Sequence, residues 1–329
     1  MIRIWLIIAS AFLLSACQST PHNEIGAFAQ ATQEITLQVD EVIVEINQSH
    51  INKQLMDIAT QHGSGREPLT RETLQSVTPL FDQSAQKQVA IYRANHALNR
   101  YAKGLQALSG AVTQADIDIA AAELASAMNG MNTSYTLLTN NDDLFQPKDM
   151  SIVASAVAAM GTSIVEKQRQ ESLKSVITQA DEKVNLITDE LVIQLADSGM
   201  EELLVSSRST HLKHALRDYS KRSSKQPMTF EQSYNETQAL YELYTIMSQT
   251  KLSLHQTRQA IKAVKKAHNS ITKEVQADRF NSKGIIAIVG ELKNQWERYD
   301  DFRDVVTSCE KGYELTGDDP RSQVVACKP

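Results

Sequence analysis

Apolar residues recur at alternating spacings of three and four along most of the chain, which is the period of a helix that buries one face. A short strand-like alternation at 35–39 is outweighed by the longer register from Ile25 to Met56. The clearest stripe comprises Ile117, Ala121, Leu124, Met128, Met131, Tyr135 and Leu138. This pattern predicts an all-α protein.

Prolines mark where long helices end, because a proline in a helix interior costs about 3 kcal/mol. The windows between Pro79, Pro147, Pro227 and Pro320 contain none. Helices are expected over 25–60, 80–109, 113–138, 151–197, 199–222, 229–275 and 284–308. Short connections between helices make neighbours antiparallel, which predicts an elongated antiparallel helical bundle with coiled-coil-like packing.

Local signals set the expected helix ends. Gly110 ends one helix and Thr113 caps the next, and Gly199 interrupts a longer one. Thr229 and Gln232 have the spacing of a capping box. The bundle is expected over 25–308, with a division into two sub-bundles near 140–149 left open, and an irregular tail over 309–329.

Inward-facing positions follow from the same registers. In the helix over 80–109 they are Ile91, Leu98, Tyr101 and Leu105, and in the last helix Val289, Leu292, Trp296 and Tyr299.

The N-terminus has the layout of a secretory signal. Arg3 precedes an apolar run over 4–14, which is shorter than the roughly 20 residues that span a bilayer. Leu14-Ser15-Ala16-Cys17 follows and resembles the lipobox of bacterial lipoproteins. The resemblance implies removal of residues 1–16 and acylation of Cys17 on its sulfur and amino group. Because several acyl chains hold a protein stably at a membrane, we expect this protein to be anchored to a membrane through its N-terminal lipid.

The residues after Cys17 set the expected location. By resemblance to enterobacterial lipoproteins, Gln18 in place of aspartate implies sorting to the outer membrane, facing the periplasm. Residues 17–24 comprise the lipidated cysteine and a polar tether containing Pro21. Because an extended residue spans at most about 3.6 Å, the folded body is expected within roughly 25 Å of the bilayer.

Composition narrows the function. The formal charge of −6 argues against a nucleic-acid-binding protein, which is usually basic. The hydrophobic content of 42% is enough for a substantial core. With Cys17 lipidated, Cys309 and Cys327 remain, and in an exported protein they are expected to form a disulfide. A metal pair is the alternative, but no neighbouring Cys/His spacing supports it.

Residues 151–165 carry no charge and many small side chains. A stretch of 15 residues is too short to span a bilayer. We interpret it as a helix buried at the bundle's centre, while a membrane-active, toxin-like bundle that inserts this segment remains the alternative.

Two segments of the sequence, 208–225 and 258–273, are rich in basic residues. In the second, Arg258, Lys262, Lys265 and Lys266 are expected to face an acidic run, Asp181, Glu182, Asp189, Glu190 and Asp197, across a helical hairpin. In the first, fewer acids are expected opposite, chiefly Glu231 and Glu236. Its residues are a candidate contact for a partner or a lipid headgroup: Arg208, Lys213, Arg217, Lys221, Arg222 and Lys225.

Motifs for chemistry are missing from the sequence. It holds no Gly-rich phosphate loop and no Gly-x-Ser-x-Gly, and His211 and His214 lack further ligands for a metal site. Trp296, Tyr299 and Phe302 are better explained by core packing than by sugar stacking. We predict no enzyme, no cofactor and no catalytic residue. The expected function is binding or scaffolding of another envelope protein.

Overall fold

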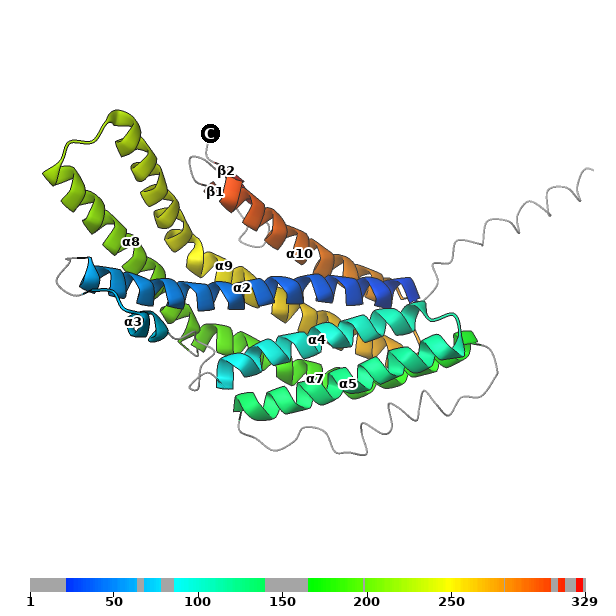
Figure 1. The fold of residues 1–329 in the computed structure, drawn as a ribbon. Coiled ribbons are helices and arrows are strands. Elements are labelled where there is room, and N and C mark those ends of the chain that lie inside the picture. Colours follow the sequence, from blue (N-terminus) through cyan, green and yellow to red (C-terminus); the bar gives the residue numbers. More distant parts are fainter. Residues whose placement is uncertain are drawn as a thin grey trace, which may run out of the picture.

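The computed structural model describes residues 22–63, 68–77, 86–139, 165–197, 199–280, 282–308, 313–316 and 324–327. It is an elongated helical bundle, as the apolar periodicity predicted (Figure 1). The helices are α2 (His22–His62), α3 (Arg71–Gln75), α4 (Gln86–Gly110), α5 (Gln114–Thr139), α7 (Val165–Asp197), α8 (Met200–Lys225), α9 (Phe230–Gln276) and α10 (Lys283–Ser308). Two strands follow, β1 (Tyr313–Thr316) and β2 (Val324–Cys327).

Helix α2 runs along the body and packs against α4, α8, α9 and α10. Helices α4 and α5 form an antiparallel pair that lies against α7, and α7 packs in turn along α9 (Figure 1). One contiguous hydrophobic core takes side chains from both sides of the 140–149 segment, for example Leu124 of α5 and Leu191 of α7.

The predicted apolar stripes form this core. In α2, Ile25, Phe28, Ile35, Val39, Val42 and Ile46 are buried, whereas Met56 is only partly covered. The α4 and α5 stripes are buried as predicted, with Tyr135 partly exposed. In α10, Val289 and Leu292 are buried and Trp296 packs against the core, while the side chain of Tyr299 lies outside the described ones.

The local signals predicted at Thr113, Gly199 and Thr229 are confirmed, whereas α2 begins at His22, inside the stretch expected to be a tether, and α8 continues to Lys225. The Thr113 hydroxyl accepts from the Asp116 N–H at 3.2 Å, and the Thr113 N–H donates to the Asp116 carboxylate at 2.9 Å. Gly199 has a φ of 80°, a left-handed conformation that favours glycine, and it separates α7 from α8. Thr229 and Gln232 form the reciprocal capping box that opens α9.

Two features differ from the prediction. Within the tail predicted to be irregular, β1 and β2 pair antiparallel, with Tyr313 opposite Cys327 and Thr316 opposite Val324. Strands of four residues are too short to show a periodic pattern. The short helix α3 was also missed, although Thr70 caps it through a bond from the Thr73 N–H.

The segment over 151–164, expected to be helical, lies outside the described residues, as does 78–85 at the expected start of α4. Cys309 and the whole of the N-terminal signal, with Cys17, lie outside them as well.

The α4–α5 pair depends on a close approach at Gly104. A Cβ placed there would lie 2.6 Å from Cγ of Leu124, a side chain with no exposed surface. At Gly110, also in α4, a Cβ would meet nothing within 4 Å. The two glycines therefore form a matched pair.

We expect Gly104→Ala to destabilise the protein by about 1–2 kcal/mol, because overpacking against Leu124 outweighs the better helix propensity of alanine. Gly110→Ala should change the free energy of unfolding by less than about 1 kcal/mol. Urea denaturation of the two variants checks this. Equal effects would contradict the proposed close approach.

Candidate functional site

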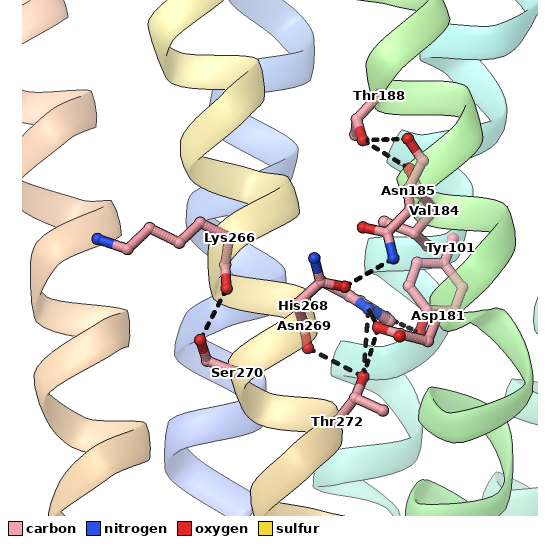
Figure 2. Close-up of polar contacts among 10 residues, drawn as sticks. All are labelled: Tyr101, Asp181, Val184, Asn185, Thr188, Lys266, His268, Asn269, Ser270 and Thr272. Carbon is pink, nitrogen blue, oxygen red and sulfur yellow. Dashed lines mark hydrogen bonds and ion pairs between the residues drawn. The ribbon is translucent and has the colours of Figure 1, made fainter.

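A buried polar cluster lies where α4, α7 and α9 meet (Figure 2). His268 of α9 has no exposed surface, and its Nε2 lies 2.8 Å from the Tyr101 hydroxyl of α4. Its Nδ1 lies 3.0 Å from Oδ1 of Asp181 in α7. The Thr272 hydroxyl donates to the same carboxylate oxygen at 2.8 Å. Asn185 of α7 adds a bond to Asn269 of α9 at 2.7 Å.

The electrostatics of the cluster favour a charged Asp181. Its partial burial raises the pKa, but hydrogen bonds from His268 and Thr272, together with the charges of His268 and Lys273, leave the pKa below its ordinary value of 3.8. Burial, with Asp181 adding to it, raises the pKa of Tyr101 well above its usual range. Either form of the imidazole satisfies both contacts: Nδ1–H donates to Asp181, and Nε2 accepts from the Tyr101 hydroxyl in the neutral ring or donates to its oxygen in the charged ring.

An imidazole between a carboxylate and a phenol has the chemistry of a proton relay. Here, however, the ring is packed in the core, 5.9 Å from the ring of Phe28 in α2 and 5.6 Å from that of Tyr101. We therefore assign the cluster to the architecture of the bundle. The sequence does contain a sign of it, since His268 occupies a position in the α9 stripe of Ile261, Val264, Ile271 and Val275.

A second feature is a two-helix arm, residues 213–248, made of the end of α8 and the start of α9. None of its side chains is fully buried: the buried residues of α8 end at Leu212 and those of α9 begin at Gln249. Figure 1 shows this hairpin projecting away from the rest of the bundle.

The arm is held together by its own polar contacts. Arg222 binds both carboxylate oxygens of Glu236 at 2.7 Å and one of Asp218 at 2.8 Å. These bonds raise the pKa of Arg222 above its usual range. The Tyr219 and Ser233 hydroxyls lie 2.8 Å apart. The two helices of the arm are thus joined near the turn.

One face of the arm is aromatic. Phe230 is 86% exposed and Tyr234 59%, and Tyr241 and Tyr244 are exposed further along the same helix. These four residues, the aromatic face, follow helical spacing, and their rings pair at centroid distances of 6.1 Å and 6.3 Å. Exposed aromatic residues gathered on one surface are typical of protein contact sites, where Tyr and Phe are enriched.

The structure does not gather the six basic residues over 208–225 into one patch. Arg208 is nearly buried and ties α8 to Glu45 of α2 and, at 2.7 Å, to the Thr250 hydroxyl of α9. Arg222 binds Glu236, one of the two acids expected opposite this segment. Lys213, Lys221 and Lys225 are exposed.

Arg217 lies next to His214, with Nη2 3.0 Å from Nδ1. The same His214 nitrogen lies 2.9 Å from the Thr60 hydroxyl of α2. His214 thus helps to attach the base of the arm to α2. Within the described ranges, no group of His, Cys, Asp and Glu side chains has the arrangement of a metal site.

The second basic segment behaves partly as expected. Lys265 binds Asp189 at 2.6 Å across the α7–α9 contact. Arg258 instead binds Glu201 of α8 at 2.7 Å, and Lys266 binds Glu291 of α10 at 2.7 Å. The acidic run therefore faces α9 as predicted, but some of its predicted partners bind other helices.

None of the helices among the described residues is long and apolar enough to cross a membrane. Comparison with protein-family models, curated proteins and solved structures finds no match to this chain.

Asp181 and Asp40 form a matched pair for a pH test. Burial raises the pKa of Asp40, although a bond from Asn95 and the charge of His96 oppose the rise. The lowered pKa of Asp181 means that its charged form stabilises the fold above pH 3.8, and that this stabilisation is lost as pH falls through the lower folded value. The raised pKa of Asp40 has the opposite effect: its charged form destabilises the fold above pH 3.8.

At pH 7 we expect Asp181→Asn to destabilise the protein by about 1 kcal/mol, since charge-assisted bonds at a partly exposed carboxylate are lost. The difference from wild type should shrink below pH 4. Asp40→Asn should leave stability at pH 7 unchanged or raised. Thermal unfolding between pH 3 and 7 measures both, and an Asp181→Asn deficit that grows on acidification would contradict the assignment.

Proposed function

We propose that this chain is a lipid-anchored envelope protein that binds a partner protein through the aromatic face of its arm. The lipid is attached at Cys17, and the protein lies on the periplasmic side of the outer membrane. The observation that carries the proposal is the exposed aromatic face, Phe230, Tyr234, Tyr241 and Tyr244, on a hairpin that contributes nothing fully buried to the core.

The chemistry of the face favours a helix as its partner. Phe230 and Tyr234 are four residues apart, and Tyr241 and Tyr244 three, which is the spacing of a seam between packed helices. Glu231 and Glu242 follow directly after two of these aromatics and border the face. An amphipathic helix with basic residues beside its apolar stripe complements both features.

A second copy of the chain fits less well. Two aromatic faces packed on one another would bring Glu231 and Glu242 of each copy to the same seam. Like charges at such positions oppose pairing.

The position of the arm also suits a partner away from the anchoring bilayer. Helix α2 has 41 residues, so it spans about 60 Å. The base of the arm contacts the C-terminal end of α2, where Thr60 lies 2.9 Å from His214, whereas His22 begins the other end (Figure 1). A lipid near His22 therefore holds the arm at a distance from the membrane.

Two further parts of the proposal concern the termini. A Cys309–Cys327 disulfide would link the residue that follows α10 to β2, where Cys327 pairs with Tyr313. The rival function, a membrane-active bundle, depends on 151–165, nearly all of which lies outside the described residues. We favour the binding function because the aromatic residues Phe230, Tyr234, Tyr241 and Tyr244 are exposed, as a partner-binding surface requires.

The lipid is tested at Cys17. Labelled palmitate should enter the wild-type protein and be absent from Cys17→Ser, which should also leave the membrane fraction, because no other anchor is proposed. Metabolic labelling followed by fractionation measures both. Equal labelling of the two proteins would end the lipoprotein interpretation.

The binding face is tested with Tyr234→Ser/Tyr241→Ser. Large aromatics at the centre of an interface commonly contribute more than 2 kcal/mol each, so capture of the partner should fall by at least about 30-fold. Quantitative crosslinking in intact cells, with identification of the captured protein, gives the readout.

The matched control is Ile119→Ser, which removes a residue that is 62% exposed on α5, away from the arm. Its crosslinking should equal that of wild type. Capture of the same partner by the arm variant at wild-type yield would refute the proposed face.

A further inference from the structure

A hollow of about 220 Å³ lies on the surface between α4 and α5. It forms where the small residues Ala97 and Gly130 face each other, at a point where a Cβ on Gly130 would lie only 3.3 Å from that of Ala97. Longer polar side chains stand around this point. Those used below are Arg93, His96, Arg100 and Ser126.

Among the described residues that line the hollow, the charged side chains are those of Arg93 and Arg100. Helix α4 contains no Asp or Glu, although the chain as a whole has a net charge of −6. Helix α5 has none after Glu123. Arg93 and Arg100 are exposed, and within the described part of the chain neither makes a hydrogen bond or an ion pair.

His96 lies between the two arginines in sequence and is half-buried. Its ring stacks on Tyr92 at a centroid distance of 6.0 Å and an interplanar angle of 4°. The acid with which it interacts is Asp40 of α2, which is itself hydrogen-bonded by Asn95 at 2.7 Å. That carboxylate is thus bound by Asn95, and no hydrogen bond or ion pair joins it to either arginine among the described residues.

The hydroxyl groups of α5 near the hollow differ in whether their proton already makes a hydrogen bond. Ser134 donates to the Gly130 carbonyl at 2.7 Å and Thr133 to the Asn129 carbonyl at 3.1 Å, so both protons are used. Ser126 is exposed and makes no hydrogen bond among the described residues. Ser126 can therefore donate to a ligand from the side opposite the arginines.

We propose that this hollow binds a phosphate group. Arg93 and Arg100 are seven residues apart, so their Cα atoms are separated by about 10 Å along the helix, and both guanidinium groups can reach an anion above His96. Donors that approach from both helices suit the several oxygens of a tetrahedral phosphate better than the two of a carboxylate. The site is independent of the arm and of the partner proposed for it.

The phosphate has two possible sources, free inorganic phosphate and the monoester of a phosphorylated lipid headgroup. Calorimetric titration of the purified full-length protein with inorganic phosphate, with glycerol 3-phosphate and with acetate distinguishes them. Both phosphates should bind at least about tenfold more tightly than acetate. Tighter binding of glycerol 3-phosphate assigns the site to headgroups, and equal or tighter binding of inorganic phosphate assigns it to the free ion.

The decisive variant is Arg93→Gln/Arg100→Gln, which should weaken phosphate binding at least about tenfold. Lys103→Gln removes the same kind of charge from an exposed position on α4 that does not line the hollow, and it should change binding less than about twofold. Because neither arginine has a partner among the described residues, the double variant should unfold at the wild-type temperature.

The Ser126→Glu variant provides an independent test of the site. The new carboxylate would place a negative charge beside the arginines and compete with phosphate, so binding should be lost without loss of stability. Absence of phosphate binding to wild type at millimolar concentration, acetate binding as tight as phosphate, or wild-type affinity in the double arginine variant would each overturn the proposal.

Discussion

The bonds around His268 constrain the rest of this structure. A buried imidazole that loses its partners costs about 1–3 kcal/mol, so Tyr101 and Asp181 must remain within reach of its two nitrogens. This requirement fixes the register of α9 against α4 and α7 at once. A similar constraint fixes α2 against α4, because the buried Asn95 donates to the Thr36 carbonyl at 2.6 Å and Asn99 to the Thr36 hydroxyl at 2.6 Å.

Fixing α9 has a consequence at its other end. The helix is continuous over 47 residues, and its buried residues all lie from Gln249 onward. The part before Gln249 therefore extends from a register that is set in the core. Arg208, bound to Glu45 and Thr250, braces the point where the arm leaves the body. The proposed binding face stands on such a preorganised support, so it would lose little conformational entropy when a partner docks.

The sequence predicted the helices well because their apolar stripes are long, and Gly199 and Thr229 identified two of their ends through local chemistry. It did not predict which stripes remain uncovered. Phe230, Tyr234, Tyr241 and Tyr244 have the same spacing as core residues, so only the packing shows that they are exposed. Arg93 and Arg100 were missed for a related reason. Their significance depends on the small residues opposite them, which periodicity within one helix does not show.

Helix α9 is continuous, with one half packed in the core and another half whose exposed aromatic face we propose binds a partner. Hydrogen–deuterium exchange tests it most directly, comparing the purified protein with the protein in isolated envelopes. In the purified protein, amides over 230–248 should exchange faster than those over 254–275, and association with the envelope should slow exchange chiefly over 230–248. Equal exchange of the two halves in the purified protein, or envelope protection that spares 230–248, would contradict it.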